Sequence, residues 1–184
     1  MARPRSVVKS IVIIIALVIV AILAIATTRP DTFAVERTTQ IDASPTEVQA
    51  YLDDFHRWPE WSPWEKLDPS MKRTYEGAPR GKGAVYIWSG NSKAGAGRME
   101  ILDSTPSQVT IKLDFLKPFE SHNIVEFKQP GPITRGAGPH PVIWSMHGPS
   151  PYPSKLMGMF VSMDKMIGKD FEAGLANLKA VAEK

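Results

Sequence analysis

The side chains best suited to acid–base chemistry near neutral pH are four histidines, His56, His122, His140 and His147. None of them lies in a known catalytic motif, because the sequence contains neither HExxH nor GxSxG. For each histidine, a surface position or a hydrogen-bonded structural role is the favoured interpretation. We therefore predict no catalytic histidine.

Carboxylates are the next candidates. Glu100 and Asp103 lie on a predicted strand that could face the interior of the domain, where a carboxylate could act as an acid or a base. Asp53 and Asp54 are adjacent, so their side chains diverge on a helix. No pair of histidine, aspartate or glutamate has metal-ligand spacing on one element, and the absence of cysteine excludes thiolate catalysis and zinc–cysteine sites. We expect no metal and no cofactor.

The charge of the chain is concentrated at its N-terminus. Four of the 22 basic residues precede residue 31, where there is no acidic residue, so 18 basic and 19 acidic residues remain beyond it. The two signs are interspersed there, whereas a nucleic-acid-binding protein needs basic residues clustered on its folded surface. Nucleic acid is therefore excluded as an expected partner.

Residues 7–28 are predicted to be a transmembrane anchor. Sixteen uninterrupted apolar residues, 11–26, extend with their neighbours and a snorkelling Lys9 to about the twenty residues that span a bilayer. Basic residues precede this segment, so the positive-inside rule places residues 1–6 in the cytoplasm and the rest of the chain outside. The alternative is a signal peptide cleaved near Ala26, which would leave a secreted or periplasmic protein.

A folded domain is predicted over residues 33–184, after a linker at 29–32. Residues 32–41 alternate in character and indicate a strand, and Ser44-Pro45-Thr46-Glu47 forms a capping box at the start of a helix. Short strands with turn signals between them follow, of which residues 108–115 alternate most clearly. The remaining strands are expected near 72–76, 84–88, 98–104, 121–127 and 142–146.

The C-terminal segment, Ser154 to Lys184, is predicted to be one long amphipathic helix that covers this sheet. Its apolar residues recur every three or four positions. Four methionines lie in its first half, where unbranched, polarizable side chains suit an adaptable pocket wall as well as an ordinary core. The expected fold class is α+β, with an antiparallel sheet wrapped around a single helix.

A proline-broken run, RWPEWSPW at 57–64, places three tryptophans at a spacing of three. Proline disfavours helical geometry in the residue before it, so Trp58 and Ser62 are expected to be extended and the rings to point in different directions. The rings could brace the end of the core, or Trp61 or Trp64 could line the mouth of a cavity. Both interpretations stay open at the level of sequence.

Several separated runs make the chain similar to the SRPBCC superfamily, and more narrowly to its START-like, polyketide-cyclase-type bacterial members. They are DFHRWPEWSPWEKLDPSMKRTYEG, IKLDFLKPFE, IWSMHG and DKMIGKDFEAGLANLKAVAEK. The resemblance implies a helix-grip fold, in which a curved seven-stranded antiparallel sheet closes over a long C-terminal helix. It also implies an apolar cavity between them that binds a hydrophobic small molecule or lipid. The proline-rich loop from Gln129 to Pro141 departs from the pattern and leaves the start of the last strand open.

We expect large apolar side chains to line this cavity, since small-molecule sites usually have few polar anchors. The candidates are Trp61, Trp64, Tyr86, Trp88, Met99, Phe115, Phe119, Trp144, Met157, Phe160, Met163 and Ile167. The favoured function is a membrane-anchored, extracytoplasmic binding domain that does not turn its ligand over. A cyclase or dehydratase acting on an apolar substrate is one alternative, and a module that only presents a surface to partners is another.

Overall fold

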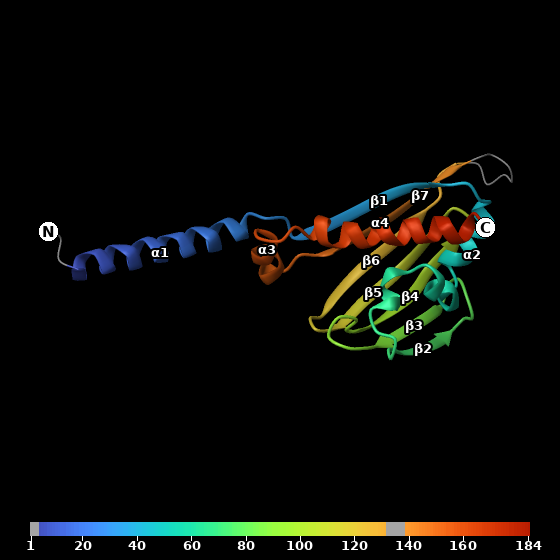
Figure 1. Ribbon diagram of the computed structural model, residues 1–184, viewed down its shortest axis with the longest axis horizontal. Helices are drawn as coiled ribbons and strands as arrows, with labels where there is room; N and C mark the ends of the chain where they lie inside the picture. The colour runs from blue at the N-terminus through green and yellow to red at the C-terminus, as the bar shows by residue number, and fades with distance from the viewer. Residues whose placement is uncertain (1–3, 132–138) are drawn as a thin grey trace.

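The computed structural model describes residues 4–131 and 139–184, and has the expected α+β architecture (Figure 1). A long N-terminal helix, α1 (Pro4–Thr27), leads into a curved seven-stranded antiparallel sheet that is covered by a C-terminal helix, α4 (Met163–Ala182). The strands are β1 (Thr32–Ile41), β2 (Lys72–Gly77), β3 (Ala84–Ser89), β4 (Ala96–Thr105), β5 (Gln108–Lys117), β6 (Ser121–Lys128) and β7 (His140–Pro149). The shorter helices are α2 (Pro45–Leu52), the 3₁₀ helices η1 (Phe55–Glu60) and η2 (Pro63–Lys66), and α3 (Tyr152–Gly158).

The strand order is β1-β7-β6-β5-β4-β3-β2, so the first and last strands of the sequence are neighbours and every pair is antiparallel. This order gives the sheet two distinct ends. β1 begins directly after α1, so the start of β1, the end of β7, the start of β6 and the end of β5 lie at one end, which we call the anchor end. The opposite end, where α4 finishes beside α2, is the far end (Figure 1).

The predicted capping box is present at the start of α2. The Ser44 hydroxyl accepts a hydrogen bond from the backbone N–H of Glu47, and the Glu47 carboxylate accepts one from the backbone N–H of Ser44. Two backbone donors that the helix leaves unpaired are thereby satisfied. The cap fixes where the chain leaves β1 and begins to cross the far end.

The prediction of one helix from residue 154 to 184 is wrong in its first part. α3 ends at Gly158, residues 159–162 form a connection, and α4 begins after Ser162, whose hydroxyl accepts a hydrogen bond from the backbone N–H of Lys165. Glycine weakens a helix and serine is a favoured N-cap, so these two residues end one helix and begin the next. The apolar residues before Ser162 consequently do not continue the stripe of α4.

The last strand begins earlier than predicted, at His140 rather than Val142, despite Pro141. Over residues 140–142, β7 pairs only with β1, because its pairing with β6 begins at Ile143. Proline is tolerated where one side of a strand lacks a ladder partner. Most of the proline-rich loop predicted before this strand, residues 132–138, lies outside the described residues.

Candidate functional site in the helix grip

Aromatic rings fill the middle and far end of the space between α4 and the sheet. The Trp144 ring on β7 stacks on Phe171 of α4, with 4.2 Å between ring centroids and 8° between planes. Trp61 packs edge-on against Trp144 at 5.5 Å and against Phe127 at 5.9 Å, and it is fully buried. This part of the grip is therefore a packed core.

The indole N–H groups of the tryptophan run bind to the protein itself. Trp58 and Trp61 donate hydrogen bonds to the backbone carbonyls of Leu52 and Tyr51, at 3.3 and 3.2 Å. Trp64 donates to the Asp170 carboxylate on α4 at 3.2 Å. A buried indole normally requires such a partner, and these partners tie the run to α2 and α4. This geometry is that of a brace.

The backbone of the run differs in part from the prediction. Trp58 belongs to η1, which continues through Pro59, so its expected extended conformation is wrong. Ser62 is extended as predicted, with φ −66° and ψ 127°. The turn between η1 and η2 sends Trp58 and Trp64 to different neighbours, Phe55 and Phe171 respectively.

The anchor-end half of the grip has a different lining. One turn before Phe171, Ile167 is only half-buried, and so is Met163 one turn earlier. The sheet contributes Met99, Leu113 and Met146 here, all of which are buried, and the Trp88–Phe115 pair lies at the same end toward the β2 edge. Methionine adapts to irregular contacts, which suits a wall that accepts a ligand.

One buried polar group in this half has an unsatisfied atom. Asn123 on β6 is 4% exposed and donates from its amide nitrogen to the Ser121 hydroxyl at 3.1 Å. Its Oδ1 has no hydrogen-bond partner among the described residues, and the same is true of the Trp144 indole nitrogen deeper in the grip. This oxygen lies against Gly148 of β7, where a Cβ would be 2.2 Å away. Buried polar atoms are usually paired, so the unpaired amide oxygen is a candidate anchor for the polar end of a ligand.

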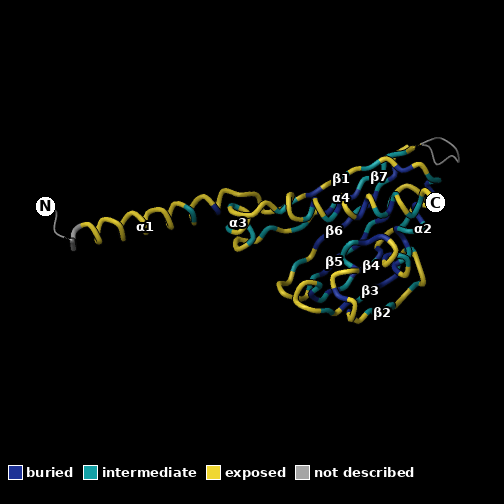
Figure 2. The backbone as a smooth tube through the Cα atoms, viewed as in Figure 1, coloured by how far each residue is buried: buried dark blue, intermediate teal, exposed yellow. Residues whose placement is uncertain are grey.

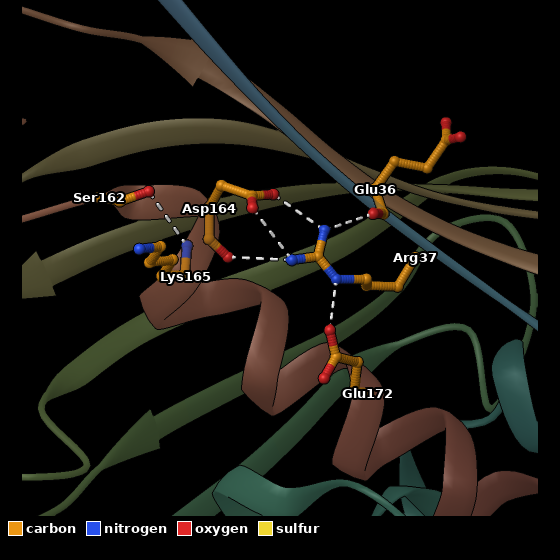
Figure 3. A network of polar contacts seen from close by, with 6 residues as sticks. All are labelled: Glu36, Arg37, Ser162, Asp164, Lys165 and Glu172. Carbon is orange, nitrogen blue, oxygen red and sulfur yellow. Dashed lines mark hydrogen bonds and ion pairs between the residues drawn. The ribbon is translucent and has the colours of Figure 1, made fainter.

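The start of α4 is held by a cluster of charges around Arg37 of β1 (Figure 3). The Arg37 guanidinium donates to the Asp164 carboxylate at 2.8 and 3.1 Å and to Glu172 at 2.7 Å. These hydrogen bonds raise the pKa of the Arg37 guanidinium above its usual range. Gly168 allows this approach, because a Cβ there would lie 2.0 Å from Arg37 Nη2. The first turns of α4 are thus fixed relative to β1.

The structure separates the predicted lining residues into two groups. Nine are buried or half-buried on the grip side: Trp61, Trp64, Tyr86, Trp88, Met99, Phe115, Trp144, Met163 and Ile167. Three lie outside it, because Phe119 is 77% exposed, Phe160 is 72% exposed and Met157 is 55% exposed. Phe119 belongs to the turn after β5, and the other two precede α4 instead of lying on it.

The inward face of β3 carries Tyr86 and Trp88. Tyr86 packs against Phe55 at 5.8 Å and Trp88 against Phe115 at 5.7 Å, so both aromatic rings point into the grip. Gly97 on β4 makes room for Trp88, because a Cβ there would lie 2.3 Å from the indole. In contrast, Glu100 lies between inward-facing neighbours and pairs with Arg98 outside.

A buried ionisable group that sequence reasoning missed lies beside Tyr86. The Tyr86 hydroxyl donates to Glu65 Oε1 at 2.6 Å, and Arg73 Nε donates to Glu65 Oε2 at 2.7 Å. Burial, followed by the bond to Glu65, raises the pKa of the Tyr86 phenol well above its usual range. Tyr86 therefore stays protonated at neutral pH and can act as a hydrogen-bond donor. Nothing in the spacing of Glu65 indicates that it faces inward.

The far end carries a chain of polar side chains and a surface hollow. His140 contacts Gln129 at 2.9 Å, Gln129 donates to Gln49 at 3.2 Å, and Gln49 donates to Ser104 at 3.0 Å. A solvent-open hollow of about 710 Å³ lies nearby, between the start of α2 and the end of α4. It is outside the grip. Among the described residues, no group of three histidines or carboxylates could hold a metal ion.

Comparison with protein families gives one match, which covers nearly all of the folded part. The family model described as "Polyketide cyclase / dehydrase and lipid transport" matches residues 32–183. No curated protein sequence matches the chain at a significant level. The match agrees with the resemblance inferred from the sequence runs.

Solved structures share the fold at low sequence identity. The di-domain ARO/CYC BexL from the BE-7585A biosynthetic pathway has a TM-score of 0.60 and 16% identity, with 86% of this chain and 52% of that chain covered. Major latex-like protein 151 from Panax ginseng has a TM-score of 0.58 and 14% identity, with 84% and 100% covered. A protein from Chromobacterium violaceum has a TM-score of 0.55 and 14% identity, with 85% and 99% covered. These likenesses show the fold alone.

Proposed function

Because the chain belongs to the polyketide cyclase / dehydrase and lipid transport family, we propose that it is a membrane-anchored domain that binds an apolar or amphipathic small molecule without turning it over. The family fold suggests a ligand-binding or cyclase-type role. The binding site proposed is the anchor-end half of the grip. No cofactor is needed for this role.

The observation that carries the proposal is the contrast between the two halves of the grip. Aromatic rings fill the middle and far end, where Trp61 packs edge-on against Phe127 and Trp144, and Phe127 packs at a tilt against Trp144. At the anchor end, Met163 and Ile167 on α4 remain half-buried, and the amide oxygen of Asn123 on β6 has no partner among the described residues. An apolar wall with one polar anchor matches the usual construction of a small-molecule site.

Membrane anchoring is supported by α1. Residues 7–27 form a helix that is long and apolar enough to cross a bilayer, and its residues are exposed along almost its whole length (Figure 2). Such an apolar surface is stable in acyl chains and costly in water. With basic residues before the helix, the domain is proposed to lie on the extracytoplasmic side. A C-terminal alkaline phosphatase fusion is expected to be active, and an inactive, cytoplasmic fusion would contradict this orientation.

Ligand binding is tested by native mass spectrometry of the full chain, extracted from membranes in mild detergent. Met163→Trp adds bulk at the half-buried start of α4, while Ala180→Trp adds the same ring at an exposed position of the same helix. We expect a bound small molecule on the wild type and on Ala180→Trp, and a much lower occupancy on Met163→Trp. Equal occupancy in all three proteins would place the adduct elsewhere, such as on α1, and would refute the site.

A cyclase-type enzyme is the second candidate, and the buried Tyr86–Glu65 pair is the observation that favours it. A phenol facing the grip could transfer its hydrogen bond from Glu65 to a substrate carbonyl. The compound recovered from the protein separates the two functions. A binding protein returns it unchanged after incubation, whereas an enzyme changes its mass, and Tyr86→Phe would abolish that change.

A further inference from the structure

The segment between β7 and α4 exposes apolar side chains that the grip does not use. We call residues 152–161 the α3 segment. Phe160 and Met157 are the exposed residues described above, and Tyr152 and Val161 are also exposed. The segment contains no acidic residue, and its single charged residue, Lys155, pairs with Asp31. An apolar surface of this kind in water marks a contact with a partner or a membrane.

The α3 segment lies against the C-terminal end of α1. The Tyr152 hydroxyl donates to the backbone carbonyl of Leu23 at 3.0 Å, and Lys155 reaches Asp31 in the linker that follows α1. Figure 1 shows α3 beside the junction of α1 with the domain, and Figure 2 shows exposed residues on both helices there. The apolar surface of α1 thus continues directly into that of α3.

We propose that the α3 segment is a second membrane contact, which lies in the interface of the bilayer that α1 spans. The proposal rests on the anchoring role proposed for α1. Continuity with α1 favours lipid over a protein partner, because Leu23 must be near acyl chains when α1 crosses the membrane. Tyr152 is suited to the level of the head groups, where amphipathic aromatic rings gather, and Phe160 to the acyl boundary. A segment without acidic residues also avoids repulsion by anionic lipids.

A membrane contact at this position would let a ligand enter the grip directly from the bilayer. The α3 segment ends at residue 161, and only Ser162 separates it from the first turn of α4. Met163 and Ile167 in the first turns of α4 line the anchor-end half of the grip. Across the same end, Leu116 near the end of β5 and Phe119 in the turn that follows are exposed. Apolar residues therefore stand on both sides of this end of the grip. The ligand would be an amphipathic lipid that passes from the outer half of the bilayer into the grip without crossing water.

The absence of cysteine from the natural sequence permits a direct test with single labelled cysteines in the full chain. Phe160→Cys reports on the α3 segment, Ile14→Cys on the middle of α1, and Ala180→Cys on the exposed face of α4 at the far end. All three positions are exposed, so a label perturbs no core packing. Each protein carries an environment-sensitive nitrobenzoxadiazole label and is reconstituted into phosphatidylcholine vesicles. Quenching by a doxyl group on the acyl chain is compared with quenching by aqueous cobalt ions.

The expected result is that labels at residues 160 and 14 are quenched by the lipid-borne doxyl group and shielded from cobalt, while the label at 180 shows the reverse. If residue 160 behaves like residue 180 while residue 14 remains in lipid, the α3 segment does not touch the bilayer and the proposal is refuted. If the label at 160 is shielded from both quenchers, a protein surface covers it, which also refutes the proposal. A label at residue 14 that is quenched by cobalt and not by the doxyl group would refute the proposal that α1 anchors the protein in the membrane. The proposal of ligand binding is tested independently, by native mass spectrometry.

Discussion

Replacement of Trp61 by alanine should destabilise the domain strongly without touching the proposed ligand site. The indole is fully buried, packs against Trp58, Phe127 and Trp144, and donates to the Tyr51 carbonyl. Truncation of a buried tryptophan costs about 3–5 kcal/mol. In a domain of this size each kcal/mol lowers the melting temperature by roughly 2–4 °C, so the expected decrease is about 6–20 °C.

Two further variants separate packing from hydrogen bonding. Trp61→Phe keeps a ring but leaves the Tyr51 carbonyl without its donor, and should cost about 1–3 kcal/mol. Phe119→Ala, at an exposed position, should change stability by less than about 0.5 kcal/mol. The assay is thermal unfolding of the full chain in mild detergent, followed by near-ultraviolet circular dichroism. Ligand occupancy is measured by native mass spectrometry below the transition.

The reasoning predicts that the folded fraction of Trp61→Ala retains wild-type occupancy. A melting temperature within about 2 °C of wild type would mean that the ring is not a brace, since less than about 1 kcal/mol would then have been lost. Normal stability combined with lost occupancy would instead place Trp61 in contact with the ligand. Either result would overturn the assignment of the tryptophan run to the core.

Two other features give predictions of their own. Gly97→Ala should lower the free energy of unfolding by about 1–3 kcal/mol, measured by thermal unfolding. The reason is that its Cβ would lie 2.3 Å from the Trp88 indole and 2.5 Å from the Asp114 carbonyl oxygen. An unchanged melting temperature would show that Trp88 moves freely. Burial raises the pKa of Tyr86 in the folded state. The contribution of Tyr86 to the free energy of unfolding is therefore complete below its pKa in the unfolded chain, about 10. Above that pH the contribution declines by up to about 1.4 kcal/mol per pH unit. Denaturant unfolding between pH 9 and 11 should therefore show a steeper alkaline loss of stability for wild type than for Tyr86→Phe, and parallel curves would contradict the raised pKa.

The sheet was largely predictable because its sequence carries the required alternation. In β5, Val109, Ile111 and Leu113 face the core while Thr110 and Lys112 face away, so period two is visible without a structure. The cap of α2 was likewise readable, since the capping box depends only on neighbouring residues. Both features depend on residues close together in the sequence, so they could be predicted without the structure.

The grip itself was harder to predict, because its composition depends on contacts between distant residues. Leu156 and Phe160 continue the apolar periodicity of α4, so sequence alone predicts one helix. Ser162 instead caps the N-terminus of α4, which is more favourable than continuing the helix through this residue. The inward position of Glu65 on η2 follows from its hydrogen bonds with Arg73 and Tyr86, which lie on β2 and β3. Hydrophobicity alone also could not separate Phe119, exposed on a turn, from Phe115 four residues earlier, which packs on Trp88.

The shortness of the connection between α1 and β1 limits where the domain can work. Only residues 28–31 separate the two elements, and four residues span roughly 14 Å even when fully extended. With α1 in a bilayer, the Tyr152–Leu23 and Lys155–Asp31 contacts shorten this reach further. A domain anchored in this way could not carry a molecule across a periplasm-sized gap, so any acceptor would have to come to the membrane surface. The domain would bind its ligand at a fixed place on the membrane. The ligand would arrive by lateral diffusion in the bilayer and leave to a partner that binds at the membrane surface.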